Sequence, residues 1–467
     1  MKTNKLLFIL IALFSINSYS QNGSFGQNSA RTIGIGNAGV ALMDRLYSNQ
    51  VNPASLMNFT DSSFFEITNI AILPNFNISG SSNILPIKDL NLYFSGVNGQ
   101  PYYLKDKDKS NIISNIGETG EIFFTSRINL LSVGFKFGNI GAFGISVDGL
   151  ANARLNLPSD MVKLVLYGNP LGITYNFKDF TYQSAFNNVI SVSYANRVYS
   201  DSVGMLKYLN VGTNVKMYSS LGFADFKTSR ASVYTNQDAH IQFDFLGTAR
   251  TTVGPEIKSM IEDDKDIETL PKSAGTGFGV DLGVLGELDN GLRFGVSITD
   301  IGSVNYTENS ETKEFSLATT VKSVNEKEID SLIDGVKQKL IGTNSFAITA
   351  PTTLRLGFAV PIHKFVSLPG LMNAYLDYAQ GFNNNYANAT TPRVSLGLDW
   401  KPFEYLPMLM TGLSNDITGN IRWSLGLGYS VWKIDLYLST YDVISAISPN
   451  TNAAIAFNFR WRFDWLN

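Results

Sequence analysis

Apolar and polar residues alternate with a period of two along most of this chain. The clearest stretch is 452–465, in which every odd position is apolar and five of the seven odd positions are aromatic. The even positions carry small or polar residues, including Arg460 and Arg462. In a β-strand this pattern places one face in apolar surroundings and the other in polar ones. Because the stretch is longer than the five or six residues of an ordinary strand, we expect it to face lipid.

The same alternation recurs and predicts fourteen strands, over 62–72, 121–137, 141–157, 186–199, 206–220, 274–287, 291–301, 351–362, 371–380, 392–402, 407–414, 421–430, 432–441 and 452–465. Short connections such as 138–140 and 288–290 alternate with long ones such as 73–120, 221–273 and 302–350. Short turns at one end and long loops at the other are typical of barrels in bacterial outer membranes. The pattern therefore predicts an all-β fold, a transmembrane antiparallel β-barrel of about 14 strands.

Residues 1–20 match a secretory signal peptide. Lys2 and Lys5 precede an apolar run over 6–16, and small residues lead up to Gln21. A run of this length is too short to cross about 30 Å of hydrocarbon as a helix. We expect the segment to be removed on export, which places the barrel in the bacterial outer membrane.

The composition narrows the classes of function. The chain has no cysteine and two histidines, so thiol catalysis, cysteine-ligated metals and a disulfide scaffold are excluded. With 39 acidic against 36 basic residues it has no electrostatic footprint for nucleic acid. No pair of carboxylates is spaced for general acid/base work. We expect no cofactor, no metal and no enzymatic activity, and an outer-membrane lipase or protease is the weakest alternative.

A glycine-rich segment lies between the signal peptide and the first strand. It contains Gly34-Ile35-Gly36-Asn37-Ala38-Gly39, which matches the dinucleotide-binding pattern G-x-G-x-x-G. That reading requires a buried strand directly before the first glycine, and no such strand precedes it. The segment runs on to Asn52-Pro53-Ala54. In these residues the chain resembles the FadL-like family of outer-membrane transporters for long-chain fatty acids and hydrocarbons. In the glycine-rich run over 277–283 and the hairpin through 299–302 it also looks similar to related barrels that assist protein export.

The resemblance implies that residues 21–60 form a hatch inside a barrel of residues 61–467. A fourteen-stranded barrel is too wide to be filled by its own side chains, so a plug is physically reasonable. A disordered periplasmic tail is the alternative. Ser55 stands where a transporter of the family would carry glycine. The hatch or gating residues expected from the resemblance are Gly34, Gly36, Gly39, Asn52, Pro53 and Ala54.

Strand parity predicts which charged side chains line the lumen. The lumen-facing residues expected are Asp148, Arg154, Lys216, Asp281, Arg293, Asp399, Arg460 and Arg462, and the same parity adds Arg393, Arg422, Lys433 and Asp435. Because both signs are present, we expect these groups to pair across the lumen or to anchor the hatch, rather than to select ions.

The leading hypothesis for function is passive uptake of hydrophobic small molecules, such as long-chain fatty acids, through a hatch-containing barrel. Cargo would leave through the wall where a strand is kinked, or beneath a shifted hatch. The expected partners are outer-membrane lipid and the apolar cargo. The alternative is an accessory or structural barrel of an outer-membrane protein export or assembly machine, which would bind other outer-membrane or periplasmic proteins through its loops.

Overall fold

The computed structural model describes residues 29–57, 63–69, 75–86, 92, 100–263, 271–322, 335–342, 345–415, 421–432, 434–443 and 452–464. The expected signal peptide over 1–20 lies outside these residues. The outer parts of the expected hatch segment, 21–28 and 58–60, lie outside them as well.

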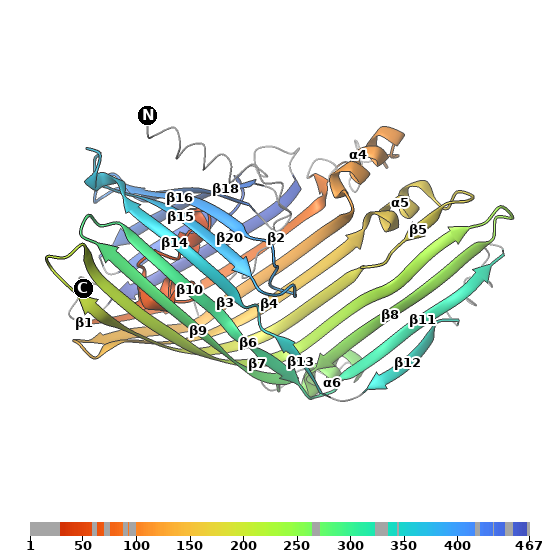
Figure 1. Cartoon of the computed structure of the whole chain (residues 1–467), viewed down its shortest axis with the longest axis horizontal. Coiled ribbons are helices and arrows are strands. Elements are labelled where there is room, and N and C mark those ends of the chain that lie inside the picture. The colour runs from red at the N-terminus through yellow and green to blue at the C-terminus, as the bar shows by residue number, and fades with distance from the viewer. Residues whose placement is uncertain are drawn as a thin grey trace.

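The strands form a closed antiparallel ring (Figure 1). Each strand of the ring pairs with the next, and β20 pairs back to β1 and β2, which together occupy one position. The ring therefore has fourteen positions, which confirms the predicted β-barrel. Its strands are β1 (Ser63–Asn69), β2 (Asn75–Pro86), β3 (Thr119–Phe137), β4 (Gly141–Pro158), β6 (Thr181–Ser200), β7 (Leu206–Thr235), β9 (Gly275–Leu288), β10 (Arg293–Tyr306), β14 (Thr353–Pro361), β15 (Leu371–Gly381), β16 (Arg393–Lys401), β17 (Met408–Asn415), β18 (Ile421–Val431), β19 (Ile434–Thr440) and β20 (Asn452–Asp464).

One strand of the ring was not predicted. β2 lies within 73–120, which the sequence pattern assigns to a loop. Its apolar positions are few, since only Phe76 and Ile78 alternate with Asn77 and Ser79 before the chain becomes serine- and glycine-rich. Because apolar and polar residues alternate over only a few positions of β2, the sequence pattern did not identify it as a strand.

The connections divide by length between the two ends of the barrel. The turns over 138–140 and 289–292 lie at one end, at the left of Figure 1. The helices α4 (Asp106–Ile116) and α5 (Ser159–Tyr167) lie at the other end. A 3-10 turn, η3 (Ile362–Lys364), follows β14 at the short-turn end.

A small sheet extends from the long-loop end. The first half of β7 pairs with β9 in the ring, and its second half leaves the ring to pair with β8 (Ile241–Val253). β8 pairs with β11 (Glu311–Val321), and β11 pairs with β12 (Lys337–Gly342). We call β8, β11, β12 and the second half of β7 the ledge. The short strand β5 (Thr174–Asn176) pairs with its β7 edge, α6 (Pro255–Asp263) follows β8, and β13 (Phe346–Thr349) pairs with β10.

The ring is apolar outside and polar inside. On β9, Phe278 and Leu282 point outward and are 68% and 51% exposed, whereas Asp281 between them is fully buried. Large apolar side chains are exposed in this way on strands all around the ring. A soluble protein has the opposite arrangement, so this wall faces the hydrocarbon of a membrane. Among the described residues, no helix has the length and hydropathy needed to cross a bilayer.

Candidate functional site: a plugged lumen

Residues 29–57 fill the short-turn half of the lumen, and we call them the hatch. They form α2 (Ala30–Gly34), η1 (Arg45–Tyr47) and η2 (Pro53–Leu56). Asn52 begins η2: its Oδ1 accepts a hydrogen bond from the Ala54 N–H at 3.1 Å, and Pro53 occupies the first position of the turn. Asparagine at a cap followed by proline favours this local structure.

Polar side chains fasten the hatch to the wall. Asn52 Nδ2 lies 3.0 Å from the carbonyl oxygens of both Val40 and Val284, so it ties two hatch segments to β9. The Val40 N–H donates to Asp377 Oδ2 on β15 at 2.8 Å. These groups are buried, and each bond satisfies a polar atom that would otherwise be buried without a partner.

Two buried ion pairs add to this attachment. Arg31 Nη2 lies 2.8 Å from Asp399 Oδ2 on β16, and its Nη1 lies 3.5 Å from Asp44. Arg45 Nη1 lies 3.1 Å from Glu66 Oε2 on β1, and both side chains are almost fully buried. Removal of one partner from such a pair leaves a buried charge without its counter-charge, which is strongly destabilising.

Glycines on the inner wall let the hatch backbone approach closely. Four of the glycine pairs that lie directly opposite each other on neighbouring strands contact the hatch, and we call them the glycine girdle: Gly134 and Gly144, Gly212 and Gly283, Gly295 and Gly357, Gly397 and Gly412. A Cβ at Gly212 would collide with the backbone of Pro53, and one at Gly412 with the backbone of Gly36. The girdle was not predicted, although its signal is present as glycine at inward positions of successive strands.

The residues expected in the hatch lie against this wall. Gly34 packs on Met410 and Gly426, and Gly36, with φ +71°, packs on Gly412. Gly39 lies within the hatch beside Thr32 and Val51, and Asn52, Pro53 and Ala54 meet the girdle on β7 and β9.

A layer of buried charges lies above the hatch, toward the long-loop end. Lys216 Nζ lies 2.8 Å from Asp281 Oδ2 and 2.7 Å from Asp300 Oδ1. Arg127 Nη2 lies 2.7 Å from Asp148 Oδ1. We call these five residues the charged belt. Gln50 Nε2 of the hatch donates to Asp148 Oδ2 at 3.1 Å, so hatch and belt are in contact.

The lumen residues expected from parity fall into three groups. The structure buries Asp148, Arg154, Lys216, Asp281, Asp399, Arg393 and Arg422 inside the ring, and leaves Arg293 half-buried. The backbones of Arg460, Arg462 and Asp435 lie on β20 and β19, but the side chains of β20 are outside the described part of the chain. Lys433 is also outside the described residues.

Two residues of the charged belt were missed because β-bulges change the parity. The register of β3 shifts between Asn129 and Leu131, so Arg127 points inward although its odd position predicts an outward side chain. The register of β10 shifts between Ile298 and Ile301, which turns Asp300 inward. A bulge places two residues opposite one and so exchanges the two faces of a strand.

An aromatic cluster closes the long-loop end of the lumen, and we call it the mouth cluster. The ring of Phe223 lies with its centroid 5.2 Å from that of Tyr306, 5.8 Å from Phe346 and 6.1 Å from Tyr386. Val189 packs in the same buried cluster. A cavity of about 20 Å³ separates it from the hatch, lined by Val189, Leu150 and Tyr218 on one side and by Gln50 and the charged belt on the other.

Two strands, β1 and β2, share one position of the ring beside the charged belt. β1 ends at Asn69 and β2 begins at Asn75, six positions apart, while their partners Ser132 and Asn129 on β3 are three apart. The chain from Asn69 to Asn75 is therefore three residues longer than the matching stretch of β3, and we call this change of register the wall break. Tyr47 of the hatch touches both sides of it: its hydroxyl accepts from Asn75 Nδ2 at 3.3 Å and lies 3.5 Å from Thr68 O.

Among the described residues, no group of three histidine, aspartate or glutamate side chains is placed to hold a metal ion. The interior of the described part thus offers a plug, a charged layer, an aromatic cluster and an irregular wall.

Comparison with known proteins identifies a family and a set of similar barrels. The model of a family of unknown function, DUF5723, matches residues 59–440. No curated protein matches the chain. Solved structures that align with it include the toluene transporter TodX of Pseudomonas putida, at 10% identity over 95% of this chain and 99% of that one, with a TM-score of 0.46. They also include the toluene transporter TbuX of Ralstonia pickettii, at 10% identity over 93% and 97%, with a TM-score of 0.45.

A FadL homologue of Pseudomonas aeruginosa also aligns, at 12% identity over 96% of this chain and all of that one, with a TM-score of 0.25. These proteins are of the kind to which the sequence shows a resemblance. Because the similarities are low, the function of this chain has to be argued from its own residues.

Proposed function

Because the chain belongs to the DUF5723 family, whose function is unknown, we propose its function from its own geometry: it is an outer-membrane channel for the passive uptake of hydrophobic small molecules. The apolar exterior requires a membrane. The expected signal peptide over 1–20 directs the protein out of the cytoplasm, and export of a β-barrel ends in the bacterial outer membrane.

The observation that carries the proposal is the position of the wall break. It lies at the level of Asn129 and Ser132, next to the charged belt and the cavity beneath the mouth cluster. A path along the barrel axis would take apolar cargo past buried charges and through the anchored hatch, where no favourable contacts compensate the lost hydrogen bonds. A path through the break leads directly into the hydrocarbon of the membrane, where apolar surface gains about 25 cal/mol per Å².

The mouth cluster supplies the entry site. Phe346 is half-buried, so an apolar molecule from outside can exchange contacts with water for contacts with its ring, and the buried rings of Phe223 and Tyr386 lie directly behind it. The cavity below has a volume of only about 20 Å³, so we propose that cargo widens it as Tyr47 and the direct hydrogen bond from Asn75 to Thr68 release the edges of the break. In this proposal the expected hatch residues, Gly34 to Ala54, act as a fixed floor that directs cargo sideways.

Long-chain fatty acids are the specific cargo that we propose among hydrophobic compounds. Their acyl chain suits the mouth cluster, and their carboxylate would take the place of an aspartate partner at Arg127 or Lys216 of the charged belt. A simple aromatic hydrocarbon would use the same rings without that charge interaction.

Uptake by whole cells tests the proposal. A strain that lacks other hydrophobic uptake channels is given labelled oleate, toluene and a small sugar, with and without this protein. We expect faster uptake of oleate and toluene and unchanged uptake of the sugar. Equal stimulation of the sugar would show an open aqueous pore, and no stimulation of any compound would contradict a channel function.

The ledge favours a second candidate, an accessory barrel of a protein export or assembly machine. Phe226, Phe245 and Phe315 share one half-exposed face of the ledge, with ring centroids about 6 Å apart. β12 pairs with β11 alone among the described strands, so its other edge offers backbone groups to a partner strand. Exchange of Phe245 and Phe315 for lysine should abolish co-purification of a partner if this role holds, and leave oleate uptake unchanged.

A further inference from the structure

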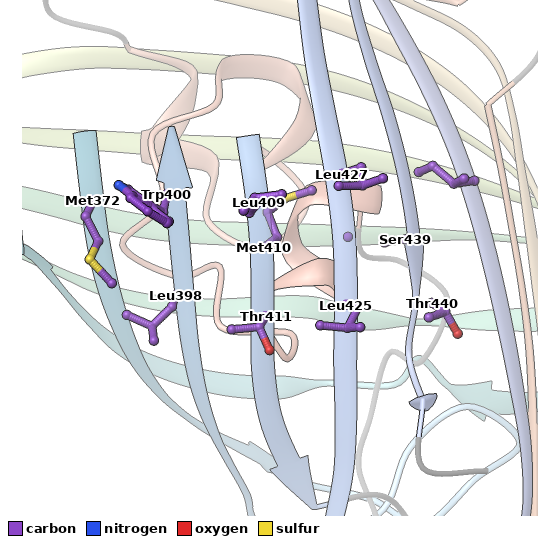
Figure 2. A pocket seen from close by; sticks show the side chains of 12 residues that line it. Met372, Leu398, Trp400, Leu409, Met410, Thr411, Leu425, Leu427, Ser439 and Thr440 are labelled. Atoms are coloured by element: carbon purple, nitrogen blue, oxygen red, sulfur yellow. The ribbon is translucent and has the colours of Figure 1, made fainter. Parts of the chain in front are cut away.

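A groove crosses the lipid-facing side of the wall from β15 to β19 (Figure 2). Its volume is about 640 Å³. One row of its side chains follows a single rung of the sheet, because Trp400 pairs with Leu409, Leu409 with Leu427, and Leu427 with Leu438. The next outward rung supplies Leu398, Thr411 and Leu425.

The floor of the groove is the rung between these two rows. It consists of Met410, Gly426 and Ser439, and the side chains of Met410 and Ser439 belong to the inner face. Asp399 continues this rung on β16. The hatch is attached to this same rung from the inside, through the ion pair of Arg31 with Asp399. In Figure 2 the hatch ribbon lies behind the strands that carry the groove. The groove and the hatch attachment are therefore back to back, one sheet apart.

The chemistry of the lining favours hydrocarbon. Leu409, Leu427 and Leu438 are each about half exposed and continue the apolar exterior of the ring. The Thr411 hydroxyl donates to Ser424 O at 3.2 Å and accepts from Trp423 Nε1 at 2.8 Å, and Trp400 Nε1 donates to Pro369 O at 3.0 Å. Their hydrogen-bonding groups are thus already used, so they present the occupant with apolar surface.

The shape of the groove suits one acyl chain. Five strands at a spacing of about 4.8 Å give it a length of about 19 Å. One leaflet of a bilayer contributes about 15 Å of hydrocarbon, half of the total thickness. Because barrel strands tilt by about 40°, a groove that runs across them is inclined to the membrane plane. A chain that hangs from a headgroup can therefore follow it into the hydrocarbon.

We propose that this groove binds one acyl chain of a membrane phospholipid, on the outer surface of the wall that holds the hatch on its inner surface. The groove is continuous with the lipid-facing exterior, so membrane phospholipids are in direct contact with it. The proposal depends on the membrane-facing wall and not on the cargo of the channel.

Lipid retention in native mass spectrometry tests the site. Leu425→Trp fills the groove, and Leu282→Trp is a matched control, since Leu282 is an exposed leucine on the lipid-facing side of β9. After purification in a lipid-free detergent, the wild type and Leu282→Trp should each retain one phospholipid. Leu425→Trp should retain about tenfold less, because the indole displaces a few buried methylene groups. Both variants change outward side chains and should keep the heat-modifiable mobility of a folded barrel.

A second measurement covers the case in which lipid is lost during purification. In a variant that keeps Trp400 and has phenylalanine at the other tryptophans, one equivalent of brominated phospholipid should quench the fluorescence in detergent. Leu425→Phe in the same background should abolish this quenching. Equal retention and equal quenching with and without the filling residue would overturn the proposal. A dimer that Leu425→Trp dissociates would make a second copy of the chain the occupant, and would overturn it as well.

Discussion

Tyr47 is the hatch residue that touches both edges of the wall break. Replacement by phenylalanine removes the hydroxyl that accepts from Asn75 and lies near Thr68. One hydrogen bond contributes about 1 kcal/mol net, so we expect the closed state to lose about that much and oleate uptake to rise about fivefold. Tyr378→Phe is the control, since its hydroxyl bonds Gln380 on the exposed side of β15. Unchanged oleate uptake in Tyr47→Phe would show that this contact between the hatch and the wall break does not control transport.

Glu66 carries the counter-charge of Arg45. Glu66→Gln keeps an oxygen that can accept from the Leu46 N–H, but it removes the carboxylate charge opposite the guanidinium. We expect the docked hatch to be destabilised by about 3 kcal/mol, because a buried charge loses its counter-charge. Limited proteolysis should then cut the hatch faster, with the barrel intact. Addition of Arg45→Gln to Glu66→Gln should recover part of the lost stability, because it removes the buried charge that has no counter-charge. If the destabilisation of the double variant were the sum of those of the two single variants, a direct ion pair would be contradicted.

At the same scale, alternation predicted seven buried lumen charges but left out five others, Glu66, Glu121, Lys136, Arg355 and Asp377, and the parity itself was wrong at two positions. It placed Asp148, Lys216 and Asp281 correctly inside, because their strands are regular at those positions. It failed for Arg127 and Asp300, where a bulge exchanges the faces of the strand. A bulge depends on the pairing with neighbouring strands, so it leaves no mark in the local pattern of one strand.

Among the elements, the glycine girdle determines how closely the hatch can dock. Gly212→Ala adds a methyl group where Pro53 and Ala54 of the hatch meet β7. We expect the barrel to fold and the hatch to be displaced, which single-channel recording in planar bilayers should report as an increased conductance. Gly149→Ala is the matched control on β4, because its added Cβ would find only ordinary contacts at 3.8 Å and beyond. Equal conductance in both variants would show that the glycine girdle does not determine how closely the hatch docks against the inner wall.

The helix α4, outside the membrane-spanning strands, gives a prediction for pH. The Lys105 N–H and then the Tyr102 hydroxyl donate to the Asp108 carboxylate, and these bonds lower its pKa. Because the pKa of this carboxyl is lower in the folded than in the unfolded state, the carboxylate stabilises the helix at any pH above the unfolded-state pKa of about 3.9. This contribution is lost as the pH falls through the folded-state pKa. The protection of the α4 amides in hydrogen exchange, measured relative to the intrinsic exchange rate at each pH, should fall in that range.

Asp108→Asn is the control for this helix. It should leave α4 less protected at neutral pH and remove the acid-dependent change in its hydrogen exchange. A wild-type helix whose amides are equally protected at neutral and acid pH, relative to the intrinsic exchange rate at each pH, would contradict the role of the carboxylate.

The strands could be predicted from sequence where a lipid face and a polar lumen impose strict alternation. The prediction was incomplete outside these conditions. β2 has few apolar positions, and the ledge strands β8 and β11 lie beyond the ring, where neither face meets a uniform solvent. The location of the hatch inside the ring rests on contacts between residues as distant as Arg31 and Asp399, which no local pattern contains.

On the scale of the whole molecule, three layers act in series. The mouth cluster admits apolar surface, the charged belt and the hatch close the axial path, and the wall break lies where these meet. The account therefore predicts sideways release into the membrane, with the hatch remaining docked during transport.

Oleate uptake by a variant without the wall break tests this claim most directly. Deletion of residues 71–73 removes the three surplus positions, so that β1 and β2 can pair with β3 as one continuous strand. The control replaces the same three residues by Gly-Ser-Gly and keeps the length. We predict that the deletion reduces oleate uptake to the level of cells without the protein, while the control retains most of it and both proteins reach the membrane folded. Undiminished uptake by a folded deletion variant would contradict sideways release.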